Sequence, residues 1–315
     1  MEARRAGLGP QPPAAAAAWL ERHTGIPADA VRLARLAGAT SSSVYAVEGW
    51  GEAGTPRFVL RVLDNADWLA QEPDLAEHEA AALVEAARAG VAAPERVAVA
   101  DTDAGFDAPA VLMSFVPGRV ELMPADTEAW LRALAITLVR IHAHPADGLA
   151  WSYRCWLDET SLTPPAWSRD QLRWQRGIDL WLASRPLLAQ QPATFVHRDY
   201  HPTNVLFQAG RVRAVVDWIN ACRGPAGIDV AHCRVNLVLM AGPALADGFL
   251  RAYRRFAPEY EHHPAWDLEV LLDAALPSPS FYPPWAAFGM PTIARGTLRR
   301  RAQEYLGHVL ARAAA

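Results

Sequence analysis

Residues 197–204 read His-Arg-Asp-Tyr-His-Pro-Thr-Asn, and residues 215–218 read Val-Val-Asp-Trp. Asn204 follows Asp199 by five residues, and Asp217 follows Asp199 by eighteen. A His-x-Asp sequence alone carries little information. An acid, an amide and a second acid at these offsets form the catalytic-loop pattern of phosphoryl-transfer enzymes, in which a strand ending in aspartate follows the loop.

Two short apolar runs follow the first segment, at residues 205–207 and 212–216, and a turn at 208–210 separates them. This pattern predicts a β-hairpin that returns Asp217 to the neighbourhood of Asn204. The alternative is a polar loop whose aspartate and asparagine make only turn hydrogen bonds. That alternative explains neither the spacing nor the second aspartate.

The three polar residues match the needs of phosphoryl transfer from a nucleotide. One carboxylate must lie near the attacking hydroxyl, which assigns Asp199 as the catalytic base or orienting group. An amide oxygen and a second carboxylate must hold Mg²⁺ against the phosphates, which assigns Asn204 and Asp217 as metal ligands. The cofactors predicted from the sequence are Mg²⁺ and either ATP or GTP as the phosphoryl donor.

The chain resembles the aminoglycoside phosphotransferase and choline kinase group from about residue 31 to about residue 240. His201-Pro202 is similar to the group's HPxN element, and Asp217 is followed by Trp218 instead of the Phe-Gly of protein kinases. The resemblance implies an α+β, bilobal protein-kinase-like fold, with a small β-rich lobe and a larger helical lobe. It also implies that Asp229 is buried and accepts N–H bonds from the catalytic loop, and His197 is expected to support that loop structurally.

The N-terminal part reads as the β-rich lobe. Strands are expected at residues 31–36, 44–48 and 58–63, a helix at 72–89, and an apolar hinge strand at 109–116 that ends at Pro117-Gly118. The predicted domains are therefore an N-terminal extension at 1–30, a nucleotide-binding lobe at 31–117 and a helical lobe at 118–315.

The chain contains no lysine, so the phosphate-binding role that a lysine has in kinases must fall to an arginine or to no residue. Arg61 is central in the third strand, and we expect it to pair with Glu79 and to reach the phosphates; the alternative is an edge-strand arginine in water. The turn at 38–43 is expected to close over the phosphates. The predicted nucleotide-binding residues are Gly38, Ser41, Ser42, Arg61, Glu79, and the hinge residues Ser114 and Val116.

The composition limits the classes of molecule that the protein is expected to bind. A net charge of −4 argues against nucleic-acid binding, and no apolar run is long enough to span a bilayer. Three cysteines without a C-x-x-C motif indicate reduced thiols and a cytoplasmic protein. Arg198 and the pair His262-His263 are interpreted as solvated residues.

The expected partner is a small molecule that carries a hydroxyl group, and its identity stays open between an aminoglycoside, a macrolide, a sugar, choline and an amino alcohol. A polycationic acceptor would need carboxylates, whereas residues 281–285 would suit a less charged one. Two other functions are weighed: a catalytically silent nucleotide-binding protein and a protein kinase. The candidate acceptor carboxylates are Asp158, Glu159, Asp170, Asp267, Glu269 and Asp273.

Overall fold

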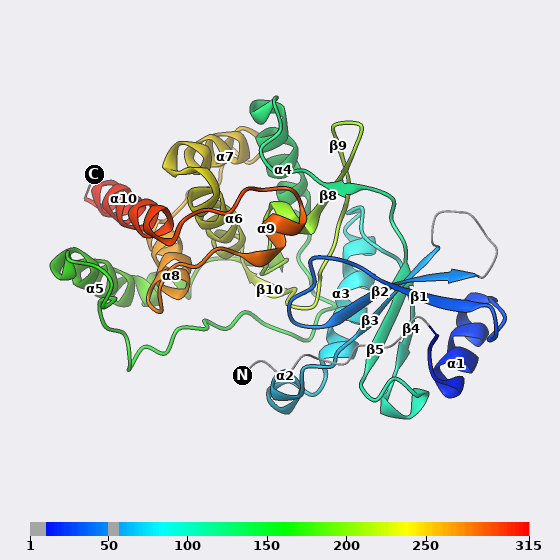
Figure 1. Cartoon of the computed structure of the whole chain (residues 1–315). Coiled ribbons are helices and arrows are strands. Elements are labelled where there is room, and N and C mark those ends of the chain that lie inside the picture. Colours follow the sequence, from blue (N-terminus) through cyan, green and yellow to red (C-terminus); the bar gives the residue numbers. More distant parts are fainter. Residues whose placement is uncertain (1–10, 50–56, 315) are drawn as a thin grey trace. The chain divides into compact units, whose positions relative to one another are not determined.

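The computed structural model describes residues 11–49 and 57–314. The chain divides into two compact units. Unit 1 runs to Arg119 and also includes residues 206–208 and 213–220, whereas unit 2 contains the remainder. The expected α+β fold is present: unit 1 is built on an antiparallel sheet, and unit 2 is mainly helical (Figure 1).

Unit 1 contains a five-stranded antiparallel sheet with the order β1-β2-β3-β5-β4. Its strands are β1 (Val31–Arg35), β2 (Ser43–Gly49), β3 (Phe58–Val62), β4 (Arg96–Ala100) and β5 (Ala110–Ser114). Strand β3 is central, because it pairs with β2 on one side and β5 on the other, and Arg61 lies opposite Val44 and Val111. The edge-strand alternative for Arg61 is therefore wrong.

Helix α1 (Ala14–Thr24) is part of unit 1 and does not stand apart as an extension. Trp19 and Leu20 of this helix belong to the buried cluster that also contains strand residues such as Leu60 and Leu112. Burial of such side chains contributes about 1.5–3 kcal/mol each. The sequence predicted an N-terminal extension at residues 1–30. Residues 1–10 lie outside the described part of the chain.

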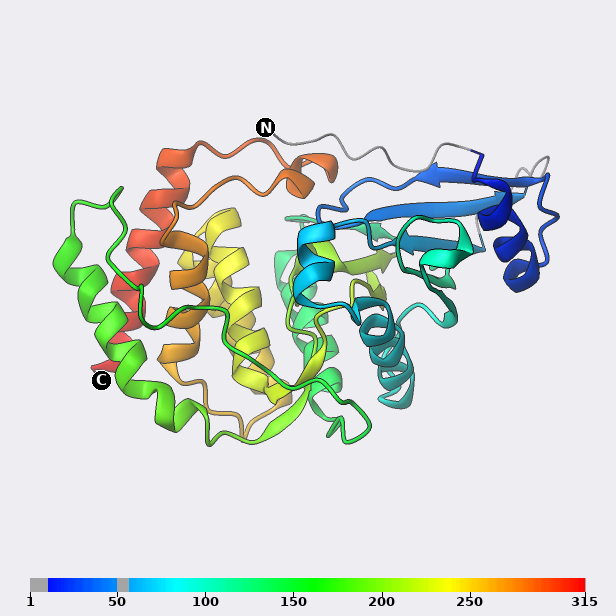
Figure 2. The same ribbon diagram turned by 90° about the horizontal axis from the view of Figure 1, so that it is seen from below.

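The helix expected at 72–89 begins later, as α3 (Leu75–Arg88), and a short helix α2 (Ala66–Gln71) precedes it. Pro73 separates the two, because proline lacks the N–H of a helix interior and disfavours helical backbone at the residue before it. Helix α3 packs against β4 and β5 and carries Glu79 on its buried side (Figure 2).

Unit 2 is formed mainly by helices that pack side by side. The unit contains α4 (Thr127–His142), α5 (Gln171–Leu188), α6 (Ala226–Ala241), α7 (Pro243–Phe256), α8 (Pro264–Ala275), α9 (Pro283–Ala287) and α10 (Arg295–Ala313). Helix α8 contacts α5, α6 and α10 (Figure 2). The close approach of α6 to α8 depends on Gly227, because a Cβ atom there would lie 2.2 Å from the Trp266 ring.

The strands around the catalytic loop form two small sheets. One pairs β7 (Ala193–Val196) with β10 (Cys222–Pro225), and the other has the order β6-β8-β9, with β6 at Arg119–Val120, β8 at Val205–Gln208 and β9 at Arg211–Val215. The predicted hairpin is thus present. Its turn residues Ala209 and Gly210 both have positive φ, as a two-residue hairpin turn with the right twist requires.

A buried ionic network joins the helices of unit 2. Arg234 on α6 is fully buried, and its Nε donates to Asp267 Oδ1 on α8 at 2.9 Å and to the Tyr305 hydroxyl at 3.1 Å. His262 Nε2 lies 3.0 Å from the same carboxylate, and its side chain is 3% exposed. The solvated interpretation of His262 is therefore wrong, because Asp267 supplies a buried partner, while His263 caps α8.

No helix within residues 11–49 and 57–314 combines the length and the apolar character that a bilayer crossing requires.

Candidate functional site

The catalytic loop follows β7, and Asp229 of α6 holds its backbone. The Asp229 carboxylate accepts the N–H of His197 at 2.7 Å and the N–H of Arg198 at 2.7 Å. Arg198 has a φ of 70°, a left-handed conformation that costs a non-glycine residue about 1–3 kcal/mol. The two hydrogen bonds to one buried carboxylate therefore fix a backbone that would otherwise relax. These are the contacts that the resemblance implied for Asp229.

Asp229 stays ionised although it is fully buried. Burial opposes the charge, but His142, whose Nε2 lies 3.2 Å from Oδ2, and the loop N–H groups outweigh it and lower the pKa of Asp229. The charged carboxylate accepts stronger hydrogen bonds than a neutral group would. The loop is thus held by an ionic clamp that spans α4, α6 and the residues after β7.

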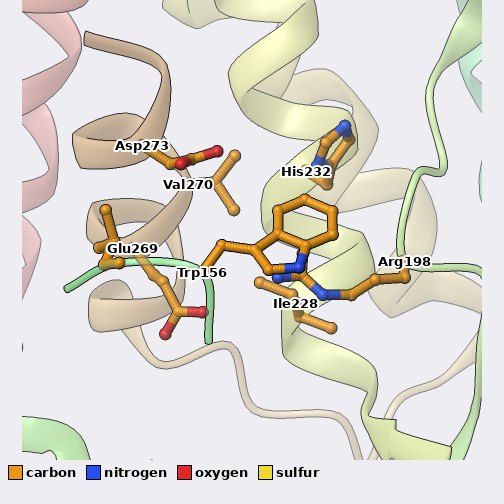
Figure 3. Close-up of a pocket in the computed structure, with 8 residues that line it drawn as sticks. Trp156, Arg198, Ile228, His232, Glu269, Val270 and Asp273 are labelled. Atoms are coloured by element: carbon orange, nitrogen blue, oxygen red, sulfur yellow. The ribbon is translucent and has the colours of Figure 1, made fainter. Parts of the chain in front are cut away.

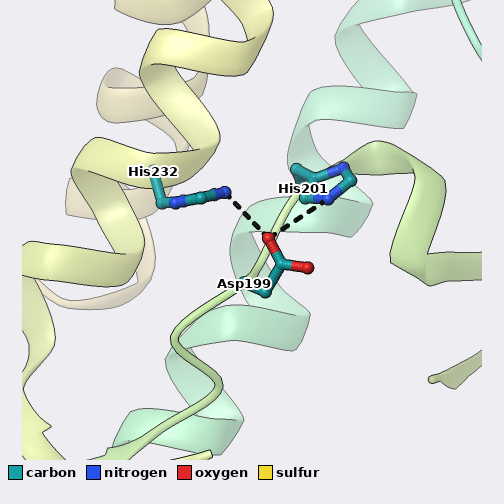
Figure 4. A group of neighbouring side chains, drawn as sticks. All are labelled: Asp199, His201 and His232. Atoms are coloured by element: carbon teal, nitrogen blue, oxygen red, sulfur yellow. Dashed lines mark ion pairs between the residues drawn. The ribbon is translucent and has the colours of Figure 1, made fainter. Parts of the chain in front are cut away.

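Asp199 presents its two carboxylate oxygens to different partners. Asn204 Nδ2 donates to Asp199 Oδ2 at 3.1 Å and to the Asp199 carbonyl at 2.9 Å. Oδ1 faces two imidazoles, with His201 Nε2 at 3.4 Å and His232 Nε2 at 3.0 Å (Figure 4). Burial opposes ionisation of Asp199, but these histidines hold its pKa well below the usual range. The carboxylate is therefore charged at neutral pH.

The ring of His197 supports the loop from within. Its Nδ1 accepts the N–H of Asp199 at 3.3 Å, and the ring is fully buried. This contact agrees with the structural role expected for His197. Asn204 uses its nitrogen toward Asp199, so its Oδ1 is the atom of the amide that is left for a cation.

His232 was missed in the sequence analysis. It lies on α6 three residues after Asp229, so both side chains lie on the same face of the helix, one turn apart. That spacing was a usable signal, because Asp229 was already expected to contact the catalytic loop. A histidine one turn further along the same helix face should reach the loop as well.

Arg198 is not a solvated turn residue. It is 5% exposed, and its guanidinium carbon lies 3.7 Å from the centre of the Trp156 ring and 5.0 Å from that of Tyr153. Two aromatic faces attract a cation strongly when solvent is excluded. The interpretation failed because the aromatic partners lie more than forty residues earlier in the chain, where the sequence gives no link to the loop.

A narrow pocket in unit 2 lies beside His232 and Arg198. Glu269, Val270 and Asp273 of α8 line its other side, and Figure 3 shows the Trp156 ring lying among these side chains. The free volume is only about 10 Å³. A second cavity of about 540 Å³ shares Leu157 and Glu269 with it.

The carboxylates proposed for an acceptor mostly serve the structure. Asp158 accepts from Thr160, Glu159 pairs with Arg185, Asp170 caps α5, and Asp267 belongs to the buried network. Glu269 accepts from the Tyr153 hydroxyl and from Trp181 Nε1, and it also lines both cavities. Of the six candidates, only Glu269 and Asp273 line the pocket next to His232.

In unit 1, Arg61 connects three of the predicted residues. Its Nη1 lies 2.7 Å from Glu79 Oε1 and 2.7 Å from Asp217 Oδ1, and its Nε donates to Ser42 Oγ at 2.8 Å. Burial disfavours the Arg61 charge, but the carboxylates of Asp217 and Glu79 outweigh this and raise its pKa. The Arg61–Glu79 ion pair expected from the sequence is present. The additional partner, Asp217, lies 156 residues away in the sequence.

Asp217 has an unusual backbone for an aspartate. Its φ is 67°, in the left-handed region, and its side chain is 35% exposed. Strained backbone of this kind persists where surrounding contacts fix it, and it concentrates at functional sites. The ion pair with Arg61 uses Oδ1, which leaves Oδ2 for a further partner.

The predicted phosphate loop is ordered around its serines. Gly38 has a φ of 97°, which only glycine adopts easily, and Ser42 is buried against Arg61. Ser41 is partly exposed at the start of the turn into β2. Ser43, which was not predicted, donates to Asp64 Oδ2 at 2.6 Å and fixes the loop to the residue after β3.

The hinge expected at Ser114 to Val116 follows β5. The Ser114 N–H donates to the Glu95 carbonyl, the Ser114 hydroxyl accepts from the Glu95 N–H, and the Phe115 N–H donates to the Arg57 carbonyl. These bonds engage two backbone donors of the hinge.

Three solved structures with a similar fold are distant in sequence. A thermostable mutant of aminoglycoside phosphotransferase APH(4)-Ia, in complex with ADP and hygromycin B, is 17% identical, with 94% of this chain and 98% of that chain covered and a TM-score of 0.59. Amicoumacin kinase hAmiN, in complex with AMP-PNP, Ca²⁺ and its substrate Ami, is 16% identical, with 88% of each chain covered and a TM-score of 0.58. Macrolide 2′-phosphotransferase MphH from Brachybacterium faecium is 19% identical, with 93% and 96% covered and a TM-score of 0.52.

The TM-scores show a shared fold. Among curated protein sequences, none matches the chain significantly. The model of the phosphotransferase enzyme family (APH) matches residues 32–266, which is well over half of the chain. On the strength of this match the protein belongs to the phosphotransferase enzyme family, and it is a small-molecule phosphotransferase with a kinase-like α+β fold.

Proposed function

We propose that the protein transfers the γ-phosphate of ATP or GTP to a hydroxyl group of a small molecule and that Mg²⁺ assists the transfer. The observation that carries the proposal is the ordered catalytic loop, in which Asp229 fixes the backbone and Asp199 is charged and partly exposed. A low pKa makes Asp199 a weak base, which suits a group that mainly orients the hydroxyl in a loose transition state. Solved structures with a similar fold hold ADP with hygromycin B, or AMP-PNP with Ca²⁺ and Ami.

The residues proposed for the metal have suitable free oxygens. Asn204 keeps Oδ1, and Asp217 keeps Oδ2 on a side chain that is 35% exposed. Amide and carboxylate oxygens are the ligands that Mg²⁺ prefers. Mg²⁺ bound there would neutralise the charge of the nucleotide phosphates. Arg61 would bind phosphate oxygens through Nη2, because its Nε donates to Ser42 and its Nη1 donates to Glu79 and Asp217. It would then have the role that lysine has in other kinases.

The acceptor is proposed to carry low or mixed charge. The pocket beside His232 offers the carboxylates Glu269 and Asp273 but also the guanidinium of Arg198, so its lining does not favour a polycation. The Trp156 ring would form an apolar wall of the site. The pocket beside His232 has room for little more than a water molecule, so the body of the acceptor would occupy the cavity of about 540 Å³ that shares Glu269 with it, a size common among ligand sites.

A panel of hydroxylated molecules tests the function. The full chain is incubated with Mg²⁺ and with ATP or GTP, together with a macrolide, an aminoglycoside, a sugar or an amino alcohol. We expect nucleotide consumption that depends on one class of acceptor, with a product whose mass has increased by one phosphoryl group. A protein that binds nucleotide but phosphorylates no acceptor would instead be the silent binding protein.

Replacement of Arg61 tests two roles of this residue, which are phosphate binding and the buried ion pair with Glu79. Arg61→Ala should lower kcat/KM for the nucleotide by about 10–100-fold, since charged hydrogen bonds contribute about 1.5–3 kcal/mol. It should also lower the free energy of unfolding by about 3–5 kcal/mol, because Glu79 loses its buried partner. Steady-state kinetics and urea unfolding measure the two effects.

The double variant Arg61→Ala, Glu79→Gln is the control for stability. It removes the unpaired buried charge of Glu79, so the free energy of unfolding should rise again in part, while kcat/KM stays low. Recovery of both quantities would mean that Arg61 acts only through the fold and does not bind phosphate.

A further inference from the structure

Three ligand atoms of types that bind transition metals converge in unit 2. They are Asp199 Oδ1, His201 Nε2 and His232 Nε2, and all lie within 4.8 Å of one another. The carboxylate oxygen is 3.4 Å from one nitrogen and 3.0 Å from the other. In a tetrahedral zinc site with bonds of about 2.0–2.1 Å, neighbouring ligand atoms are about 3.4 Å apart. Figure 4 shows both imidazoles directed at the same carboxylate oxygen.

We propose that Asp199, His201 and His232 bind one borderline transition-metal ion, with Zn²⁺ the expected occupant. Its ligands differ from the residues proposed for Mg²⁺, which are Asn204 and Asp217. Imidazole nitrogens suit zinc, nickel and copper, whereas Mg²⁺ takes oxygen ligands. Three protein ligands leave a fourth position open for water or for a hydroxyl group.

The surrounding contacts orient the ligands in advance. Thr203 Oγ1 lies 2.6 Å from His201 Nδ1, so the far side of that ring is held and Nε2 is aimed at Asp199. Asn204 Nδ2 holds Asp199 Oδ2 at 3.1 Å and leaves Oδ1 to the two histidines. Partners behind the ligands are what fix ligand orientation in metal sites. His232 is carried by α6, which the buried network of Arg234 fixes in place.

A metal ion can reach these atoms. The side chains of Asp199 and His232 are 25% and 15% exposed, and His232 lines the pocket shown in Figure 3. The ring of Tyr282 stands edge-on to His201, with 5.7 Å between the ring centres, and encloses that side. One carboxylate with two neutral imidazoles would leave a bound divalent ion with a single positive charge, which water or an acceptor oxygen can solvate.

The other explanation for the cluster is a proton. A protonated His232 paired with Asp199 would give the same distance of 3.0 Å without any metal. Only the metal explanation predicts that the protein binds one metal ion per chain at this cluster. The two explanations also differ in the role of His201, because a simple His232–Asp199 ion pair does not need a second imidazole beside the same oxygen.

Occupation of this site should inhibit phosphoryl transfer, because the metal takes the oxygen that would orient the acceptor hydroxyl. This consequence rests on the proposed function, whereas metal binding itself does not.

The experiment uses the full chain, stripped of metal with a chelator. Co²⁺ is added first, since a tetrahedral cobalt site with nitrogen and oxygen ligands gives intense visible absorption. Zn²⁺ affinity is then measured by competition with a chromophoric chelator. His232→Gln removes one ligand, and His308→Gln makes the same change at an exposed histidine of α10.

We expect one Co²⁺ per chain with a tetrahedral spectrum. Zn²⁺ affinity should fall by about 100-fold or more in His232→Gln and stay unchanged in His308→Gln, since the loss of a partner behind a ligand already costs about 10–100-fold. Equal affinities in the wild type and in His232→Gln would overturn the proposal, as would an octahedral spectrum.

Inhibition is read separately, as the ratio of rates with and without Zn²⁺ for each protein. We expect a chelator that binds Zn²⁺ but not Mg²⁺ to restore the wild-type rate, and we expect His232→Gln to be less sensitive to Zn²⁺ than wild type. If Co²⁺ and Zn²⁺ bind as expected but no acceptor is phosphorylated, the proposed function fails and the metal site stands.

Discussion

Asp199→Asn should lower kcat by about 10²–10⁴-fold, the range that a positioned acid–base or orienting group contributes. The variant keeps the size of the side chain and its contact with Asn204, but it removes the charge that faces His201 and His232. Nucleotide affinity should change little, because Asp199 is assigned to the hydroxyl acceptor. Single-turnover kinetics and nucleotide titration separate the two quantities.

Asp247→Asn is a matched control. Asp247 lies in the same unit, its side chain is 36% exposed, and it is also paired with cations, Arg234 and Arg312. The control should keep kcat near the wild-type value. An Asp199→Asn enzyme with wild-type kcat would remove Asp199 from the mechanism.

Asp229→Ala should lower the free energy of unfolding by about 3–5 kcal/mol, the same loss that we expect for Arg61→Ala. It leaves the N–H groups of His197 and Arg198 without their acceptor and deprives buried His142 of its carboxylate. The left-handed backbone of Arg198 should then relax, so kcat should fall together with stability. Asp229→Asn, which keeps one acceptor oxygen, should lose less of both.

The stability effect should depend on pH. The pKa of Asp229 is lowered in the folded protein, against burial, by His142 and by the loop N–H groups. The Asp229 carboxylate therefore stabilises the folded protein at pH values above its pKa in the unfolded chain, about 3.9. This stabilisation disappears as the pH falls through the lower pKa that Asp229 has in the folded protein. Urea unfolding of wild type and Asp229→Ala, followed by tryptophan fluorescence, should show a difference that is constant near neutral pH and shrinks below about pH 4. A difference independent of pH would contradict the ionic clamp.

Local patterns in the sequence were sufficient for several elements. Alternating apolar residues and turn residues predicted the hairpin after the catalytic loop, and the structure has it at Val205–Gln208 and Arg211–Val215. The position of Arg61 in the middle of an apolar strand predicted a buried cation with a carboxylate partner, because an isolated charge there would be costly. The structure provides Glu79 as that partner.

The spacing of Asp199, Asn204 and Asp217, together with the resemblance at His201-Pro202, was sufficient to predict the family, because these are properties of local sequence. The replacement of the usual lysine by Arg61 as phosphate anchor stays a prediction. Only the tertiary structure decided which distant side chains meet: His232 beside Asp199, Trp156 over Arg198 and Asp217 on Arg61. The reason is physical. A periodic pattern shows which face of a helix or strand is buried, but the partner on that face depends on how segments far apart in the chain pack together, and such packing determines charge, burial and metal-binding geometry.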